Sequence, residues 1–401
     1  MEKMDFKALE DFCNKNRLAG DRVLDWIMYY GAEKNKLAHQ YDLKEKELKH
    51  VFRKLDPVTL GKIKTQYITF EIFKEDGLIH KYLNHAAVKN LAKTDYDILK
   101  EASRFPYEYV FVDVLENPAP DFYKVQNVFT DEEMLVYSPG MTHDVKRAGM
   151  FFLLVYYNGQ CFQTFGPMGG FMGFDADDVH CYATEWEPDL QSDLELSDYI
   201  QKKPLKFSAL LSYSNLPLTA HKEHEVVETI TFTESGELDQ RKLKKNFTVE
   251  KIGGLSRYTH KKYGEFPHFA TLYHDLPEEE LVLVAMTEKG HQELVKSVLE
   301  IGVELPVMIS LRVHPTMRLA MKEIFRREIA FHPYEGIFDV DKPSEKEKLK
   351  PINEFLSLMI EQVNANQKPD LKKLSERCGV DIHTANDIYK MILEKVGKNL
   401  D

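Results

Sequence analysis

The sequence predicts a multidomain protein of mixed α+β class, and three observations support this prediction. Apolar residues recur at three-residue and four-residue spacing in residues 1–103, which is typical of amphipathic helices. Residues 104–185 hold short β-rich runs separated by turn residues, and residues 266–340 alternate strand-like with helix-like segments. A chain of 401 residues is long enough for about two to four domains, so these segments can have separate cores.

Residues 1–103 are expected to form an N-terminal helical domain. The apolar positions with helical spacing include Leu9, Phe12, Cys13, Val23, Trp26, Ile27 and Tyr30. The last helix of this domain should begin after an N-cap at Thr94 and end before Pro106.

Residues 104–185 are expected to form a small antiparallel β-barrel or meander, because five strand-like runs follow one another at short intervals. Asn158 and Gly159 stand between the last two runs. An Asn-Gly pair in this position predicts a tight two-residue hairpin turn, since both central residues of such a turn need positive φ.

The remaining boundaries are set by composition and pattern. Residues 186–265 form a connecting region whose structure the pattern leaves open. Residues 266–340 form the mixed α+β unit, in which one helix ends at Gly302 and another begins with Pro315. Residues 341–401 begin with a charged connector and continue as a helical tail.

The tail contains a helix-turn-helix-like segment. Asp370 is an expected helix cap, and Gly379 stands where the turn between two helices requires positive φ. The residues that this pattern exposes to a DNA groove or a partner protein are His383, Thr384, Asn386 and Lys390. Residues 369–398 hold six basic and five acidic residues, so little counterion release is available to drive DNA binding.

A glycine-rich segment is a candidate ligand loop. Its glycines are Gly166, Gly169, Gly170 and Gly173. The Lys-Ser/Thr of a phosphate-binding loop is missing, and the acidic residues that follow would repel phosphate. The segment therefore predicts either a wide barrel loop or the lip of a ligand or peptide site.

Three groups of residues contain side chains that can ligate a metal. Asp175, Asp177, Asp178 and His180 lack the spacing of a calcium loop and favour a helix cap or a turn. His221 and His224 lack the HExxH arrangement of zinc peptidases. The four cysteines form no CxxC pair and are expected to be reduced. The sequence therefore predicts neither a bound metal nor a cofactor.

Residues 95–180 and 266–302 resemble, in their hydrophobic rhythm, a diffuse group of uncharacterised bacterial proteins, some of which carry a zinc-binding SEC-C tail. The segments that carry this resemblance include DYDILKEASRFPYEYVFVDVLENP and FATLYHDLPEEELVLVAMTEKGHQELVKSVLE. The clustered cysteine and histidine ligands of SEC-C are missing from this chain, so the resemblance implies no zinc site and no catalytic residue.

Charge and apolar content narrow the classes of function. The chain has 53 basic and 65 acidic residues, a net charge of −12, which disfavours a nucleic-acid partner. The longest apolar run, residues 150–157, is too short to cross a membrane, and the N-terminus lacks the apolar core of a secretion signal, so a cytoplasmic protein is expected.

No pattern in the sequence names a nucleophile with its base. The prediction is a non-enzymatic interaction or regulatory protein with a protein partner. Two alternatives stay open: an enzyme whose site is assembled from residues distant in sequence, and a DNA-binding regulator that acts through the C-terminal segment.

Overall fold

The computed structural model describes residues 5–141, 148–303 and 309–339, and in the C-terminal part residues 354–356, 358–359, 362, 369–382, 385–386 and 389. The chain divides into two compact units, Met1–Pro333 and Tyr334–Asp401. Helices and sheets are combined in the first unit, and the described elements of the second are helical, which confirms the predicted mixed α+β class of the chain.

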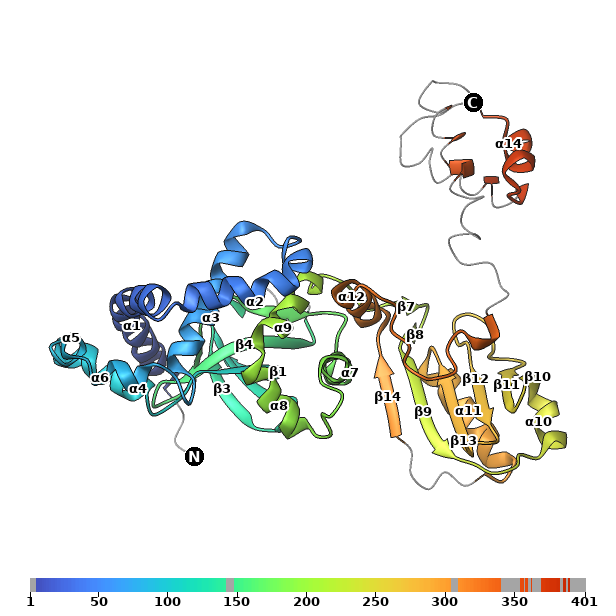
Figure 1. Ribbon diagram of the computed structural model, residues 1–401, viewed down its shortest axis with the longest axis horizontal. Coiled ribbons are helices and arrows are strands. Elements are labelled where there is room, and N and C mark those ends of the chain that lie inside the picture. The colour runs from blue at the N-terminus through green and yellow to red at the C-terminus, as the bar shows by residue number, and fades with distance from the viewer. Residues whose placement is uncertain are drawn as a thin grey trace. The chain divides into compact units, whose positions relative to one another are not determined.

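The first unit begins with helices that lie against a β-barrel (Figure 1). They are α1 (Phe6–Lys34), α2 (Leu37–Phe52), α3 (Pro57–Phe73), α4 (Ile79–Tyr82), α5 (Ala86–Lys89) and α6 (Lys93–Ala102). The carboxylates of Asp5 and Asp56 accept backbone N–H bonds at the starts of α1 and α3. Helix α6 starts two residues earlier than expected, so Ala92 is the N-cap and Thr94 lies inside the first turn.

The barrel is closed, as the sequence predicts. Its strands are β1 (Glu108–Ala119), β2 (Phe122–Asn127), β3 (Glu133–Tyr137), β4 (Met150–Tyr157) and β5 (Phe162–Thr164), with β6 (Gly169–Phe171) added beside β4. The order is β1-β2-β3-β5-β4, and β4 pairs with β1 to close the ring. The expectation of a purely antiparallel barrel is wrong at one place, because β3 and β5 run parallel. Register shifts after Val114 and Glu116 bend β1 away from a regular ladder.

Strands β4 and β5 form the predicted hairpin, but the connection between them is not the expected two-residue turn. It is a loop of four residues, 158–161, and Gly159 alone has positive φ, at 92°. Asn158 is buried, and its side-chain oxygen accepts the backbone N–H groups of Gln160 and Cys161 at 2.9 Å each. This side-chain bonding takes the place of a second residue with positive φ.

The predicted wide loop at residues 166–173 is also wrong at its centre. Gly169 and Gly170 belong to β6 and pair with Phe152 and Phe151 of β4. A Cβ atom at Gly169 would overlap Leu211, so a residue without a side chain is needed at this close approach.

The rest of the first unit contains a second, fully antiparallel sheet. Before it come α7 (Ala176–Trp186), α8 (Asp193–Lys202), α9 (Pro204–Ser208), the 3₁₀ helix η2 (Ala209–Tyr213) and the short hairpin β7 (Ala220–His221) and β8 (His224–Glu225). The sheet strands are β9 (Glu228–Glu234), β10 (Phe247–Ile252), β11 (Leu255–His260), β12 (Thr271–Asp275), β13 (Glu280–Ala285) and β14 (Ile309–Val313), accompanied by α10 (Gln240–Asn246), α11 (Glu288–Glu300) and α12 (Pro315–Phe325).

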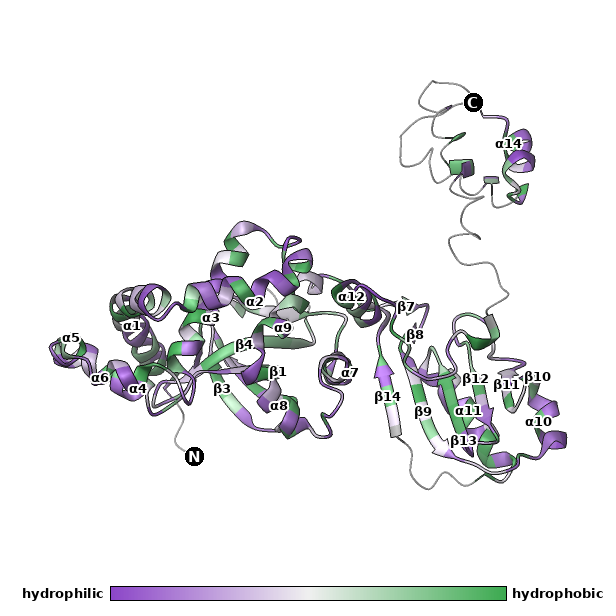
Figure 2. Cartoon of the chain, in the orientation of Figure 1, coloured by the Kyte–Doolittle hydropathy of each residue, from purple (hydrophilic) through white to green (hydrophobic). Residues whose placement is uncertain are grey.

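The strand order of the second sheet is β10-β11-β12-β13-β9-β14. Strands from both sides of residue 265, the expected boundary, pair in this one sheet. Its apolar core includes Leu272 of β12, Leu283 of β13 and Leu294 of α11, and Figure 2 shows apolar residues along β13. Within the described part of the chain, no helix has the length and apolar content needed to cross a membrane.

The second unit contains η3 (Ile337–Asp339) and α14 (Leu371–Cys378). The predicted cap is confirmed, because the Asp370 carboxylate accepts the N–H of Lys373, and Gly379 ends α14 with a φ of 69°. An apolar cluster joins residues on both sides of the undescribed stretch: Phe355, Met359, Leu374, Cys378, Val380 and Ala385.

Candidate functional site

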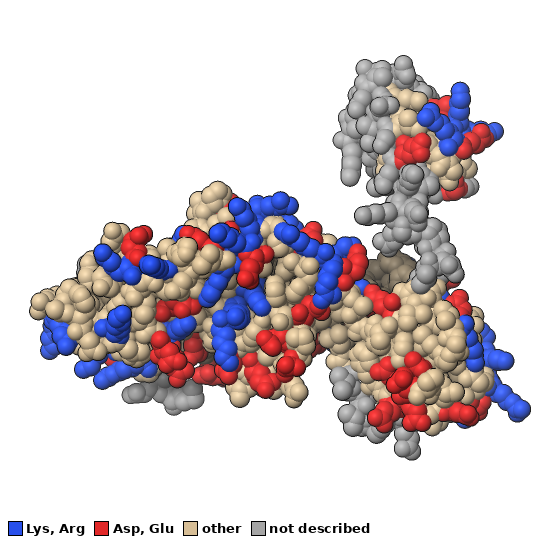
Figure 3. All heavy atoms as spheres, viewed as in Figure 1, with Lys and Arg blue, Asp and Glu red and all other residues tan. Residues whose placement is uncertain are grey.

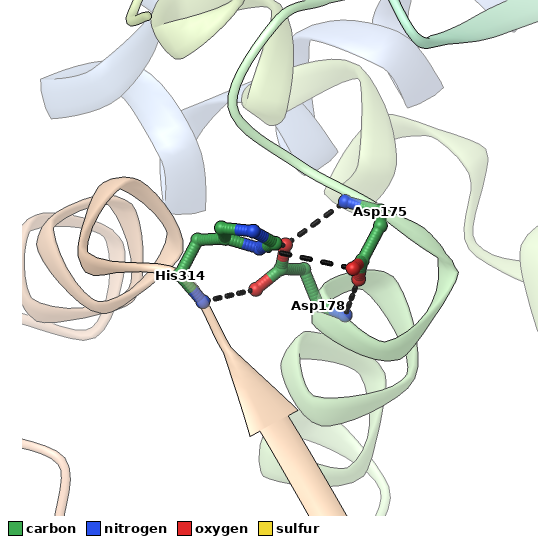
Figure 4. A group of neighbouring side chains, drawn as sticks. All are labelled: Asp175, Asp178 and His314. Carbon is green, nitrogen blue, oxygen red and sulfur yellow. Dashed lines mark hydrogen bonds and ion pairs between the residues drawn. The ribbon is translucent and has the colours of Figure 1, made fainter. Parts of the chain in front are cut away.

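A histidine between carboxylates forms one candidate site (Figure 4). His314 is the N-cap of α12, and Pro315 follows it at the first helical position. Asp175 is the N-cap of α7, where its carboxylate accepts the N–H of Asp178 at 3.1 Å and its own N–H donates to the Asp178 carboxylate at 2.9 Å. This reciprocal capping box confirms the cap expected near residue 175.

Both ring nitrogens of His314 face carboxylates. Nδ1 lies 2.7 Å from Oδ2 of Asp178, and Nε2 lies 2.8 Å from Oε1 of Glu225 in β8. The backbone N–H of His314 donates to Oδ1 of Asp178 at 2.8 Å. Because a ring nitrogen must carry a proton to donate, this arrangement selects the doubly protonated imidazolium.

The electrostatics agree with a charged histidine. Burial lowers the pKa of His314, but the hydrogen bonds with Asp178 and Glu225 and the charges of Asp178 and Asp175 outweigh it and raise the pKa to about 9. Burial raises the pKa of the Asp178 carboxyl, and the bonds from His314 oppose that shift. The ring of His314 is 3% exposed and Asp178 is 0% exposed, so solvent screens this pair very little.

Asp175, Asp178 and His314 could also hold a divalent cation, since each offers one ligand atom within a small space. The histidine pair with Glu225 would then serve as the outer hydrogen bond that fixes a ligating imidazole. However, both oxygens of Asp178 already accept hydrogen bonds, and the cation would have to displace the proton between Asp178 and His314. The geometry therefore fits a proton better than a metal.

The second candidate site is a cavity of about 600 Å³ between α1, α6 and the barrel. Aromatic side chains make much of its wall: Phe12, Tyr107, Tyr137, Tyr156, Tyr157 and Phe165. The ring of Tyr107 stacks on that of Tyr156, with centres 4.6 Å apart, and on that of Phe73, with centres 4.9 Å apart. The side chains of Tyr107 and Tyr156 in the cavity wall are therefore held in place by ring packing.

The rim of the cavity is polar and charged. Arg17 and Asp21 lie one turn apart on α1, and Asp97 and Glu101 lie one turn apart on α6. Deeper in the cavity, the Gln163 side chain accepts from Asn158 at 2.9 Å and donates to the Cys13 carbonyl at 3.2 Å. The barrel side is therefore held in place by hydrogen bonds.

The structure separates the residues that the sequence singled out. Gly166 lines the cavity with a φ of 77°, whereas Gly169 and Gly170 lie in β6. Gly173 is buried, and its carbonyl accepts a hydrogen bond from the hydroxyl of Thr316. Of the C-terminal candidates, Asn386 is exposed, and its side chain donates to the carbonyl of Ile382 at 2.8 Å. His383, Thr384 and Lys390 lie outside the described residues.

Sequence reasoning missed His314 and the rim of the cavity. The signal for His314 was a His-Pro pair between a predicted strand and a predicted helix, but nothing local connects it to Asp178, which is 136 positions away. The rim had a weaker signal, namely charges four residues apart on two helices. Comparison of the chain with protein-family models, with curated proteins and with solved structures finds no match.

Proposed function

We propose that this protein is a non-enzymatic regulatory protein that binds a small organic ligand in the cavity between α1, α6 and the barrel. The observation that supports the proposal is the cavity itself, which combines aromatic walls with a charged rim. Its volume of about 600 Å³ lies within the usual range of small-molecule sites, roughly 300–1,000 Å³.

The rim favours a cationic ligand with a flat apolar body. The charged side chains that line it are one guanidinium, Arg17, and the carboxylates of Asp21, Asp97 and Glu101. Glu101 forms an ion pair with Arg104, in which Nη1 lies 3.3 Å from Oε2. Even without Glu101, the two carboxylates of Asp21 and Asp97 leave an excess of negative charge over Arg17. Tyrosine and phenylalanine rings attract ammonium groups and stack with flat molecules, whereas a phosphate would meet an excess of negative charge.

Binding is favoured over catalysis by the residues that line the cavity. The described lining residues include no histidine, lysine, serine or cysteine side chain. These are the usual nucleophiles and proton carriers of enzymes that work without a metal. The enzyme alternative would therefore depend on carboxylates and on tyrosine and threonine hydroxyls at this site.

The proposal can be tested with two probes of similar shape and opposite charge. Tryptamine carries an ammonium group on an indole ring, and indole-3-acetate carries a carboxylate on the same ring. We expect calorimetry to find tryptamine bound at least about tenfold more tightly, a difference of roughly 1.4 kcal/mol. Asp97→Asn should reduce that preference, and Asp198→Asn on the exposed side of α8 should leave it unchanged. No binding of either probe at millimolar concentration would contradict the proposal.

We extend the proposal to the multidomain layout. Residues 341–401 would be a separable, helix-turn-helix-shaped module that recruits a protein partner in the cytoplasm. The cap at Asp370, the turn residue Gly379 and the apolar cluster around Leu374 and Ala385 support the shape.

DNA binding through the same segment is the second candidate. On the face of the molecule that Figure 3 shows, Lys and Arg side chains are mixed with Asp and Glu, also around α14. That face therefore lacks the continuous positive surface that a phosphate backbone would need. Gel-shift titration with random duplex at physiological salt should therefore give a Kd of roughly 10⁻⁴ M. Micromolar binding that is lost in the double variant Asn386→Ala, Lys390→Ala would favour the DNA-binding candidate instead.

A further inference from the structure

Two cysteines that are 148 positions apart meet beside the cavity. Cys13 lies on α1, Cys161 lies in the loop between β4 and β5, and their Sγ atoms are 3.4 Å apart. Both side chains are buried, with exposed fractions of 0% and 2%. The sulfurs are in hydrogen-bond contact and need to approach by about 1.4 Å to reach the length of a disulfide bond, roughly 2.0 Å.

The side chain of Asn158 holds the two sulfurs together. Its Nδ2 lies 3.3 Å from Sγ of Cys13 and 3.6 Å from Sγ of Cys161. The same amide is fixed from its other side, because its oxygen accepts two backbone N–H groups of the loop. The arrangement is therefore built by the loop and does not depend on a chance contact of two thiols.

The two thiols are chemically unequal. The hydrogen bond from Cys161 lowers the pKa of Cys13, burial opposes this, and the hydrogen bond from Asn158 lowers it further. The hydrogen bond with Cys13 raises the pKa of Cys161, and burial raises it further. Nδ2 of Asn158 also lies closer to Sγ of Cys13 than to Sγ of Cys161, so we take Cys13 as the sulfur that ionises first and acts as the nucleophile.

Packing limits which oxidant can reach the pair. Leu9, Phe122 and Tyr137 pack around the sulfurs on the apolar side. Phe12 and Gln160, the residues just before the two cysteines, line the cavity. Because the sulfurs are buried next to residues that line the cavity, we expect only a small oxidant, arriving from the cavity side, to reach them, and a bulky disulfide such as oxidised glutathione to be excluded.

We propose that Cys13 and Cys161 form a reversible dithiol–disulfide site that is oxidised by hydrogen peroxide. The Cys13 thiolate attacks one peroxide oxygen, the O–O bond breaks, and the other oxygen leaves as hydroxide, which takes up a proton to become water. Cys13 is then a sulfenic acid. The sulfur of Cys161 attacks the sulfur of Cys13, the S–O bond breaks, and a second water leaves. Two thiols and one peroxide become one disulfide and two waters, with two electrons passing from sulfur to oxygen.

The other two cysteines serve as internal controls. Cys181 is buried on α7, and burial raises its pKa to about 12. Cys378 lies in the apolar cluster of the second unit. Neither belongs to the Cys13 and Cys161 pair, so the proposal requires both to stay reduced. The site is independent of the proposed ligand and would exist in a protein whose cavity binds nothing.

The test is thiol counting and peptide mapping of the folded, full-length protein. Reduced protein is treated with hydrogen peroxide, quenched, denatured and alkylated. We expect two of the four thiols to be lost, a crosslinked peptide pair containing Cys13 and Cys161, and a mass decrease of two hydrogens. Dithiothreitol should restore all four thiols, and the oxidised protein should melt several degrees higher, because the crosslink restricts the unfolded chain.

Two serine variants separate the steps. Cys161→Ser should stop at the sulfenic acid of Cys13, which dimedone traps, and Cys13→Ser should keep its thiols reduced at the same peroxide dose. Cys181→Ser should form the disulfide like the unmodified protein. In the unmodified protein, survival of all four thiols, a crosslink that includes Cys181 or Cys378, or oxidation of Cys13 without a crosslink would overturn the proposal. The map of the unmodified protein decides the question even where a variant fails to fold.

Discussion

Asp178 accepts hydrogen bonds from both the backbone N–H and the imidazole of His314, across 136 positions of sequence. This one carboxylate therefore links the first turn of α7 to the residue at which β14 ends and α12 begins. Asp178 also accepts the N–H of Asp175, so the same side chain caps its own helix. The pair joins a helix that follows the barrel to a strand of the second sheet.

Replacing His314 with Gln should destabilise the first unit by about 3 kcal/mol, because Asp178 is left as a buried carboxylate without its cation. Urea unfolding followed by circular dichroism measures this change. Glu225→Gln is the matched control, since the Glu225 side chain is 48% exposed and its removal should cost under about 1 kcal/mol. Equal losses for the two variants would show that burial of Asp178 is not the cause.

The stability of the first unit should fall as the solution becomes alkaline. The pKa of His314 is raised to about 9, above its usual value of 6.5, so its contribution is complete below pH 6.5 and is lost as the pH rises through 9. The expected loss is about 1–3 kcal/mol. Urea midpoints at pH 6, 7.5 and 9.5 measure it, and His314→Gln should flatten the curve. A curve that keeps its slope in this variant would assign the dependence to other groups.

The purified protein should contain no stoichiometric metal at the His314 site. The proton between His314 and Asp178 already neutralises the buried carboxylate, so a cation gains little there. Elemental analysis after gentle purification, and melting curves with and without zinc or a chelator, measure this. About one zinc or manganese per chain, absent from the His314→Gln variant, would show instead that the cluster is a metal site.

Gly166→Ala should destabilise the protein by roughly 1–3 kcal/mol. Gly166 has a φ of 77°, and a Cβ there would lie 3.0 Å from the side chain of Gln66. Gln66 in turn donates to the carbonyls of Phe165 and Pro167, so its displacement breaks two bonds that hold this segment.

Gly61→Ala is the opposite control for the same measurement. Gly61 lies on the exposed side of α3, with ordinary φ and no atom within 4 Å of the added Cβ. Alanine should stabilise this helix by about 0.5–1 kcal/mol. The contrast between the two glycines would be lost if the cavity-side segment adapted freely to a side chain.

A chain that ends at Lys342 should stay folded and soluble. The apolar cluster of the second unit is built from its own residues, among them Phe355, Met359 and Leu374. Removing residues 343–401 therefore removes this apolar cluster as a whole, with no part of it left exposed on the remaining chain. Melting temperature and light scattering measure the outcome. Precipitation, or a fall in melting temperature of more than a few degrees, would show that the tail completes the core of the first unit.

Local patterns predicted much of the fold. Five strand-like runs became the strands of a closed barrel, Asp370 and Asp175 are caps, and Gly302 and Gly379 have the positive φ that ends a helix. These features depend on residues within a few positions of one another. The hairpin at Asn158 and Gly159 was predicted correctly, but its loop has four residues in place of the expected two-residue turn, because a buried side chain that bonds the loop cannot be recognised from a dipeptide.

By itself, the sequence determined most of the helices and strands outside residues 186–265, because periodicity and capping act over one or two turns. Only the tertiary structure decided that β3 pairs in parallel with β5, that Asp178 meets His314 and that Cys13 meets Cys161. Each of these contacts joins residues from separate elements, and the two side-chain pairs span more than a hundred positions. Whether the residues of such a pair come close in space depends on how whole sheets and helices pack to bury apolar surface, and no local sequence pattern contains that information.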